Sequence, residues 1–301
     1  MALGYDGKLY ILAFDHRGSF QKKMFGIEGD PTPEETDKII DAKALIFEGM
    51  EIAVERGLDA SSAGVLVDEQ FGGDVPELAR KHGLSLTMPV EKSGQDEFDF
   101  QYGQDFGAHI EEFDPFASKV LVRYNPEGDE VMNQRQLGRL KQLADWLHDN
   151  GRLFLFELLV PPTPEQIEAA GGDEQRWDSQ ERPKLMKVAI EELQERGVEP
   201  DIWKIEGIDR REDCETISAT TRRDGRDGVA CVVLGRGADD GAVDHWLRMG
   251  SGVPGYIGFA IGRSIWWDPM KGFVDGNLGR EEAAKQIAAN YRRFIDVYQG
   301  R

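Results

Sequence analysis

Short runs of apolar residues recur along the chain, and polar segments rich in turn residues separate them. The runs are almost continuously apolar, a pattern typical of parallel strands buried on both faces, whereas half-exposed strands alternate apolar and polar positions. Eight runs fit this description, and we expect a β-strand at each. They span residues 9–14, 63–67, 84–90, 119–123, 153–158, 201–205, 229–234 and 256–261.

Helical patterns fill the segments between these runs. They cover residues 33–56, where Thr32 is a candidate cap, and then 75–82, 133–150, 181–196, 211–223, 241–249 and 280–298. Eight strands that alternate with helices predict an α/β fold, a (β/α)8 TIM barrel, with residues 1–301 as a single domain. Two long segments, 90–115 with a short helix and 161–182, are expected as loops that build the active site or a lid.

Composition narrows the possible partners. The sequence holds no apolar stretch approaching the ~20 residues that a membrane span needs, and its N-terminus does not resemble a secretion signal, so we expect a cytoplasmic protein without a membrane partner. A net charge of −20 disfavours binding to nucleic acid or to anionic membranes. An anionic substrate would need a local basic pocket that works against this overall field. Barrels of this size commonly self-associate, so we expect a homo-oligomer.

The most informative segment runs from Pro200 to Gly207 and reads Pro-Asp-Ile-Trp-Lys-Ile-Glu-Gly. Successive side chains of a strand face opposite sides, so Lys204 and Glu206 point the same way and Trp203 points away from them. Burial disfavours a charged ammonium, and a neutral lysine amine is a nucleophile toward carbonyl carbon. The pattern predicts imine (Schiff-base) chemistry at Lys204. The alternative is a structural ion pair with Glu206 or with a neighbouring strand.

Glu157 lies within the apolar run Phe-Leu-Phe-Glu-Leu-Leu of the fifth strand. Burial in such surroundings raises the pKa of a carboxyl group, so we expect Glu157 to exchange protons near neutral pH. Cleavage of a carbon–carbon bond through an imine needs a nucleophilic amine, a proton shuttle and a base for the hydroxyl next to the breaking bond. Lys204 and Glu157 would supply the first two, and Asp15 or Lys119 the third. No metal or other cofactor is expected for this chemistry.

Charged residues and glycines follow the apolar part of the predicted strands, where a TIM barrel carries its active site. Two strand ends share one plan: Gly235-Arg-Gly237 after the seventh strand and Gly262-Arg-Ser264 after the eighth. Glycine lets backbone N–H groups approach an anion, and arginine matches the oxygens of a phosphate. We therefore expect a phosphorylated small-molecule substrate held by Gly235, Arg236, Gly262 and Arg263. Further candidate substrate contacts at strand ends are His16, Arg17, Lys92 and Arg123.

Longer motifs give the chain a family resemblance. They are Asp15-His-Arg-Gly-Ser19, Leu66-Val-Asp-Glu-Gln-Phe-Gly72, Val90-Glu-Lys-Ser-Gly94, Phe156-Glu-Leu-Leu-Val-Pro161, Gly197-Val-Glu-Pro-Asp-Ile-Trp-Lys-Ile-Glu-Gly207 and Gly258-Phe-Ala-Ile-Gly-Arg263. The sequence resembles the DUF2090, or IolC-type, class I aldolase domain that follows the sugar-kinase domain in fused inositol-catabolism proteins. The resemblance covers nearly the whole chain. More distantly, the motifs resemble the class I tagatose-bisphosphate and sulfofructose-phosphate aldolases.

The resemblance implies roles for the residues at matching positions. In the tagatose-bisphosphate group the imine lysine lies on the sixth strand in a Lys-x-Glu setting, which matches Lys204. The proton-transferring glutamate of the fifth strand matches Glu157. An aspartate after the first strand and a lysine on the fourth contact substrate hydroxyls, and they match Asp15 and Lys119. The phosphate-binding Gly-Arg of the eighth strand matches the Gly262-Arg263 pair.

For the inositol-pathway family, the resemblance implies 2-deoxy-5-keto-gluconate 6-phosphate as the substrate, cleaved to dihydroxyacetone phosphate and malonate semialdehyde. The carboxylate of that substrate needs a cation, for which Arg123 or Arg17 is the candidate. The kinase half is absent from this sequence, so we expect a free-standing version. His16 stands where the tagatose-bisphosphate group has a plainer motif, and we expect it to read a different hydroxyl or carboxylate.

Two other functions stay open. A magnesium-dependent lyase would use oxygen ligands at the barrel mouth and would reduce Lys204 to a charge partner. A non-catalytic sugar-phosphate-binding protein would need the phosphate site but not Lys204 and Glu157 together. The candidate magnesium ligands are Asp68, Glu69, Glu91, Glu157 and Glu206.

Overall fold

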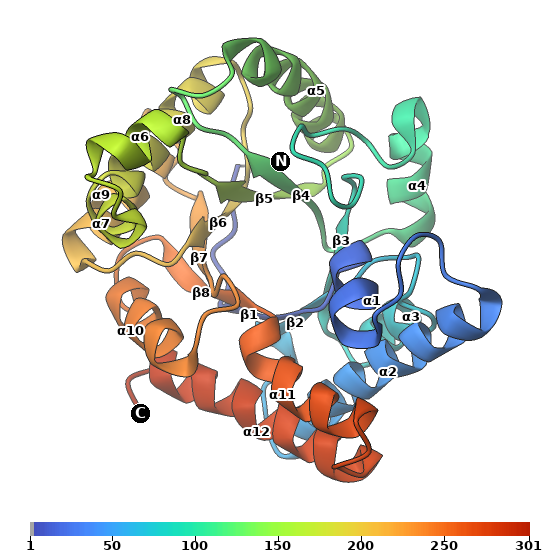
Figure 1. Cartoon of the computed structure of the whole chain (residues 1–301). Helices are drawn as coiled ribbons and strands as arrows, with labels where there is room; N and C mark the ends of the chain where they lie inside the picture. Colours follow the sequence, from blue (N-terminus) through green and yellow to red (C-terminus); the bar gives the residue numbers. More distant parts are fainter. Residues whose placement is uncertain (1–2) are drawn as a thin grey trace.

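Eight parallel strands close into a barrel in the computed structural model, which describes residues 3–301 (Figure 1). Neighbours in the barrel are neighbours in sequence, and the last strand pairs with the first. The strands are β1 (Leu9–Ala13), β2 (Ala63–Leu66), β3 (Ser85–Pro89), β4 (Ala117–Arg123), β5 (Leu153–Leu159), β6 (Ile202–Glu206), β7 (Ala230–Leu234) and β8 (Tyr256–Ile261). The predicted TIM barrel is confirmed, since each apolar run forms a strand.

Helices surround the barrel (Figure 1). They are α1 (Gly18–Phe25), α2 (Pro33–Glu55), α3 (Val75–Lys81), α4 (Phe106–Phe113), α5 (Glu130–Asp149), α6 (Pro164–Ala169), α7 (Glu174–Gln180), α8 (Arg182–Glu195), α9 (Arg211–Thr221), α10 (Asp240–Gly250), α11 (Arg263–Val274) and α12 (Arg280–Tyr298). All the helices expected from the sequence are present, and α4 is the short helix expected within 90–115. Within residues 3–301, no helix is both long enough and apolar enough to cross a membrane.

Four helices lie where none was predicted. α6 and α7 occupy the segment 161–182, which was expected as a loop. α1 and α11 begin at strand ends without a side-chain hydrogen bond to cap them, and α11 contains Pro269. Capping residues and uninterrupted periodicity are the usual signals of a helix, so these two left little trace in the pattern. Both contribute residues to the mouth of the barrel.

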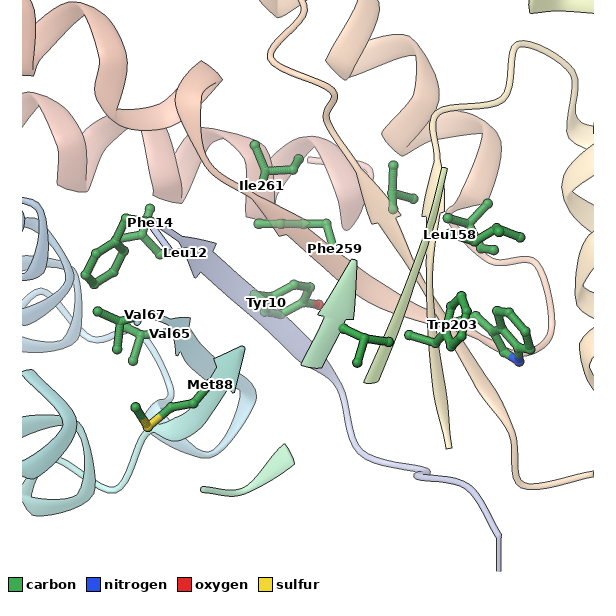
Figure 2. Close-up of a cluster of buried hydrophobic side chains, with 14 of the residues drawn as sticks. Tyr10, Leu12, Phe14, Val65, Val67, Met88, Leu158, Trp203, Phe259 and Ile261 are labelled. Carbon is green, nitrogen blue, oxygen red and sulfur yellow. The ribbon is translucent and has the colours of Figure 1, made fainter. Parts of the chain in front are cut away.

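Two layers of apolar side chains explain the continuous apolar runs. The strands alternate between an inner cluster, which fills the barrel, and an outer cluster, which packs against the helices. On β1, Ile11 belongs to the inner cluster and Leu12 to the outer. Figure 2 shows part of the outer cluster, which includes Trp203. The next residue on β6, Lys204, therefore faces into the barrel, and the predicted placement of Trp203 and Lys204 on opposite faces is correct.

A buried ion pair joins α2 to the end of β2. The ammonium of Lys43 contacts the carboxylate of Asp68, and neither side chain is exposed to solvent. Asp68 also accepts a hydrogen bond of 2.9 Å from the backbone N–H of Phe71. Burial raises the pKa of Asp68 even though Lys43 acts in the opposite direction. Removal of either partner would leave a buried charge without compensation.

Asp68→Ala should lower the free energy of unfolding by about 3–5 kcal/mol, because it leaves the ammonium of Lys43 without its counter-ion. The double replacement Lys43→Met with Asp68→Leu should recover most of that loss, and urea unfolding measures both. The exposed pair of Lys38 and Glu34 on α2 provides the control, since Lys38→Met should leave stability nearly unchanged. Equal losses in Asp68→Ala and Lys38→Met would contradict this account.

Candidate active site

One cavity of about 680 Å³ opens at the carboxyl ends of the strands. This is the end of a TIM barrel that carries the active site. Its walls come from strand ends, from α1 and α11, and from the segment that follows β3. All the site candidates from the sequence line this cavity: Asp15, His16, Arg17, Lys92, Lys119, Arg123, Glu157, Lys204, Gly235, Arg236, Gly262 and Arg263.

Lys204 and Glu157 lie side by side on neighbouring strands. The parallel register sets Glu157 of β5 opposite Lys204 of β6, and Nζ of Lys204 is 3.0 Å from Oε2 of Glu157. Both side chains are almost fully buried. Lys204 therefore pairs with the neighbouring strand, and no ion pair joins it to Glu206 within residues 3–301. At this distance an amine and a carboxyl group can exchange a proton without rearrangement.

The ammonium of Lys119 holds three carboxylates that come from three other strand ends. Its Nζ lies 2.8 Å from Oδ2 of Asp15, 2.7 Å from Oε1 of Glu91 and 3.1 Å from Oε2 of Glu157. The contacts with Asp15 and Glu91 are hydrogen bonds, and the contact with Glu157 is an ion pair. Glu157 lies between Lys119 and Lys204 and links them. The sequence analysis named Glu91 only as a candidate magnesium ligand. Its contact with Lys119 was missed, because that contact depends on distances between strands.

The charges of Lys119 and Lys204 shift the pKa values of their acidic neighbours, and these acids shift the pKa of Lys119. Burial by itself raises the pKa of Glu157, but Lys204 and Lys119 outweigh burial and lower it below its ordinary value. The expectation of a raised pKa for Glu157 is therefore wrong, because both lysines come from other strands. Burial likewise raises the pKa of Asp15, but Lys119 and other nearby cations lower it well below its ordinary range. Burial works against the charge of Lys119, yet its three carboxylates raise its pKa well above the ordinary value.

Glu91 differs from the other two carboxylates. Burial raises its pKa in spite of Lys119, and its Oε2 is buried without a hydrogen-bond partner among residues 3–301. Its backbone carbonyl accepts a hydrogen bond of 2.6 Å from Nη2 of Arg17. Arg17 is only 4% exposed, and in the described chain its Nε has no partner and its guanidinium has no ion pair. A buried guanidinium on a cavity wall without a protein counter-ion suits an anionic group of a ligand.

His16 follows Asp15 and packs edge-on against Trp266 of α11, with ring centroids 5.6 Å apart. Burial lowers the pKa of His16 to about 4, although Asp15 acts in the opposite direction. His16 is therefore neutral near pH 7 and can offer a hydrogen bond but not a positive charge. Trp266 donates from Nε1 to the carbonyl of Ala13 at 2.9 Å, which fixes α11 against the end of β1.

The two Gly-Arg strand ends meet at one side of the cavity. Nη2 of Arg263 donates to the carbonyl of Arg236 at 3.0 Å. A Cβ added at Gly237 would lie 2.5 Å from Cζ of Arg263, and Gly237 has a φ of 69°, so only glycine suits this position. α11 begins at Arg263 without a side-chain cap, which leaves its first backbone N–H groups available to an anion.

Arg236 contacts carboxylates of the protein. Its Nη1 lies 2.8 Å from both carboxylate oxygens of Asp178 in α7, and its Nε lies 3.3 Å from Oε1 of Glu206. Asp178 also accepts a hydrogen bond of 2.7 Å from Nε of Arg182, at the start of α8. This network was not predicted, because Asp178 lies in α7, a helix that the sequence pattern did not reveal.

The other two candidate cations are more exposed. The side chain of Arg123 is 36% exposed and donates from Nη1 to the carbonyl of Gln95 at 2.7 Å. Lys92 is 44% exposed and pairs with Asp99 at 2.7 Å. Of the two arginines considered for a substrate carboxylate, Arg17 is thus the better shielded from water.

The five carboxylates considered as magnesium ligands do not form one group. Asp68 is paired with Lys43, and Glu91 and Glu157 share Lys119. Within the described part of the chain, no group of three or more His, Cys, Asp and Glu side chains is arranged to hold a metal ion. This arrangement does not favour the magnesium-lyase alternative.

A comparison with known protein families shows which family the chain belongs to. A family described as an uncharacterized protein conserved in bacteria (DUF2090) matches residues 5–301. The chain belongs to the DUF2090 family. This confirms the resemblance carried by the motifs. No curated protein matches the sequence significantly.

Several solved structures resemble the DUF2090 protein in fold. An archaeal fructose 1,6-bisphosphate aldolase has a TM-score of 0.59 and 14% identity, over 98% of this chain and 95% of that one. A Schiff-base-forming fructose-1,6-bisphosphate aldolase has a TM-score of 0.56 and 15% identity, over 95% and 94%. A protein from Corynebacterium glutamicum has a TM-score of 0.58 and 17% identity, over 96% and 88%. At such identities the likeness shows the fold alone.

Lys119→Met should destabilise the DUF2090 protein by about 3–5 kcal/mol near pH 7, because it leaves buried carboxylates without their shared cation. The loss should shrink as the pH falls. In the wild type, the lowered pKa values of Asp15 and Glu157 contribute stability above their unfolded-state values of about 4, and this contribution is lost as the pH falls through the lower folded-state values. In the variant, burial and the mutual repulsion of the carboxylates raise these pKa values above those of the unfolded chain. The folded variant then binds protons at a higher pH than the unfolded chain does, so its stability increases as the pH falls toward about 4.

Urea unfolding of both proteins at several values between about pH 7 and pH 4.5 measures this difference. We expect the gap between wild type and Lys119→Met to narrow steadily over that interval. A gap that does not change with pH would show that Lys119 is not the shared counter-ion of these carboxylates.

Proposed function

We propose that this DUF2090 protein is a class I aldolase that forms an imine through Lys204 and cleaves a phosphorylated keto sugar or keto sugar acid. The observation that carries the proposal is the 3.0 Å contact between Nζ of Lys204 and Oε2 of Glu157, both buried on the wall of one cavity. The likeness in fold to fructose-bisphosphate aldolases, one of them described as Schiff-base-forming, supports the same class of reaction.

The proposed reaction uses the two residues in turn. Glu157 accepts a proton from Lys204, whose amine then adds to the substrate carbonyl, and the proton returns as water leaves and the imine forms. The iminium draws the electron pair of the adjacent carbon–carbon bond as that bond breaks. The hydroxyl next to the bond loses its proton and becomes the aldehyde of the first product. Glu157 then helps to protonate the enamine, and water releases the second product from Lys204.

Asp15 suits the role of base for the substrate hydroxyl better than Lys119 does. The pKa of Asp15 lies well below its ordinary range, so this side chain is a carboxylate at neutral pH. The pKa of Lys119 is raised well above its ordinary value, so it stays an ammonium, and it already pairs with three carboxylates. In this proposal Lys119 holds the acids in place and compensates for their charge.

The charges of the cavity support an anionic substrate. The whole chain carries 36 lysines and arginines against 56 acidic residues, but the cavity wall reverses this balance with 8 against 6. Arg263 and the first N–H groups of α11 would hold a phosphate. Arg17 would hold a second anionic group near the end of β3.

Among phosphorylated keto sugar acids, 2-deoxy-5-keto-gluconate 6-phosphate meets these requirements. Its phosphate would lie at Arg263 and its carboxylate at Arg17, and its cleavage would yield dihydroxyacetone phosphate and malonate semialdehyde. Tagatose bisphosphate and sulfofructose phosphate are the alternative substrates. Each also carries two anionic groups, so the choice among them depends on the group that Arg17 receives.

Lys204→Met should abolish turnover while the fold, followed by circular dichroism, stays intact. Borohydride treatment of the wild type with dihydroxyacetone phosphate and EDTA should leave a covalent adduct, which peptide mass spectrometry maps to Lys204. Lys141→Met is the matched control, because Lys141 is an exposed lysine paired with Asp145 on α5. It should keep both adduct and turnover. Activity retained by Lys204→Met, or lost to EDTA and restored by magnesium, would refute the imine mechanism.

Arg263→Ala should raise KM for a phosphorylated substrate by roughly tenfold to a hundredfold, because a charge-assisted hydrogen bond to phosphate is lost. The KM for the matching unphosphorylated sugar should change little. Steady-state kinetics with the two substrates tests this selectivity. Equal effects on both substrates would argue against a phosphate site at Arg263.

A further inference from the structure

Asp178 is the one carboxylate of the segment 161–182 that is shared between two arginines of the described chain. Both of its oxygens lie 2.8 Å from Nη1 of Arg236, and its Oδ1 accepts a hydrogen bond of 2.7 Å from Nε of Arg182. Burial raises the pKa of Asp178, but the two arginines outweigh it and lower the value. Asp178 is therefore a carboxylate that ties α7 to the end of β7.

Arg182 makes this tie rigid. It is only 2% exposed, and besides Asp178 its Nη2 donates to the carbonyl of Gly207 at 2.6 Å, just beyond β6. Glu206, two residues after Lys204, accepts a hydrogen bond of 2.9 Å from the backbone N–H of Val160. These contacts anchor Asp178 and Glu206 to the barrel, so Arg236 binds to two fixed carboxylates.

The residue that Asp178 binds, Arg236, also has an unusual backbone conformation in the loop after β7. Arg236 has a φ of 54°, a left-handed conformation that residues other than glycine rarely adopt without support. This conformation sets the direction of the Arg236 carbonyl, which receives the hydrogen bond from Arg263. It also sets the position of Gly237, over which the Arg263 guanidinium lies. The backbone of Arg236 and Gly237 thus forms the surface that the Arg263 guanidinium contacts.

We propose that Asp178 is a positioning residue for the phosphate site: it anchors Arg236, and through Arg236 it holds the β7 loop and Arg263 in the arrangement that receives phosphate. This inference rests on the proposed function for the identity of the anion. It gives the two Gly-Arg strand ends different roles. Arg263 touches the phosphate, whereas Arg236 is the anchor of the loop. The segment after β5 then acts on phosphate affinity without contacting the substrate.

Borohydride trapping at increasing donor concentration tests this role with two donors, dihydroxyacetone phosphate and dihydroxyacetone. In Asp178→Asn, the concentration of dihydroxyacetone phosphate for half-maximal trapping should be about tenfold higher than in the wild type, because one charged contact is misplaced. The concentration of dihydroxyacetone for half-maximal trapping should not change. Arg236→Gln breaks the same contact and leaves Asp178 paired with Arg182, so it serves if Asp178→Asn folds poorly. The double variant should be no weaker than either single one.

Asp173→Asn is the matched control. Asp173 lies in the same segment, is exposed, and caps α7 through a hydrogen bond from the backbone N–H of Arg176. Asparagine caps a helix as well as aspartate does, so this variant removes one negative charge and keeps the fold. It should trap both donors as the wild type does. Equal losses for both donors in Asp178→Asn, or no loss for either, would overturn the proposal.

Calorimetry with inorganic phosphate separates this inference from the proposed reaction. Weaker phosphate binding by Asp178→Asn than by Asp173→Asn supports the role of Asp178, whether or not the wild type forms an adduct at Lys204. The absence of that adduct would reject only the aldolase. An adduct at Lys204 with equal phosphate affinity in the two variants would reject only the role of Asp178.

Discussion

One ammonium allows three acids to share the interior of this barrel. Lys119 contacts Asp15, Glu91 and Glu157, which approach from three different strand ends. Without a cation between them, three buried carboxylates would repel one another and take up protons. With it, Asp15 and Glu157 remain ionised beside Lys204. The charge state of the acids beside Lys204 therefore depends on Lys119, a side chain that contacts three acidic residues of the protein.

The barrel and the meeting of the candidate residues at its mouth were predictable, because both depend on local patterns. An apolar run bounded by turn residues marks a strand, and alternation along β6 is enough to set Lys204 and Trp203 on opposite faces. The position of a residue just after a strand is enough to place it at the mouth of a barrel. These inferences need no knowledge of which strands touch.

The pKa values and side-chain contacts of the candidate site depended on distances between strands, which the sequence does not show. The pKa of Glu157 was predicted in the wrong direction because the apolar neighbours in its own strand are visible in the sequence, whereas Lys204 and Lys119 are not. Arg236 and Arg263 follow similar glycines, yet Arg236 pairs with Asp178, whereas Arg263 is the first residue of α11. The helix α6 could have been found, because its capping box is local: Thr163 and Gln166 exchange hydrogen bonds at its first turn.

The seam between β8 and β1 joins the side of the cavity that carries Gly262 and Arg263 to the first strand. A Cβ at Gly262 would lie 2.3 Å from the carbonyl oxygen of Ala13, and that same oxygen receives the hydrogen bond from Trp266. During synthesis on the ribosome, β6 with its lysine emerges well before β8. Until β8 docks beside β1, the nascent chain holds the amine without Gly262 and Arg263 on the same cavity wall. Closure of the barrel is thus also the step that completes the cavity.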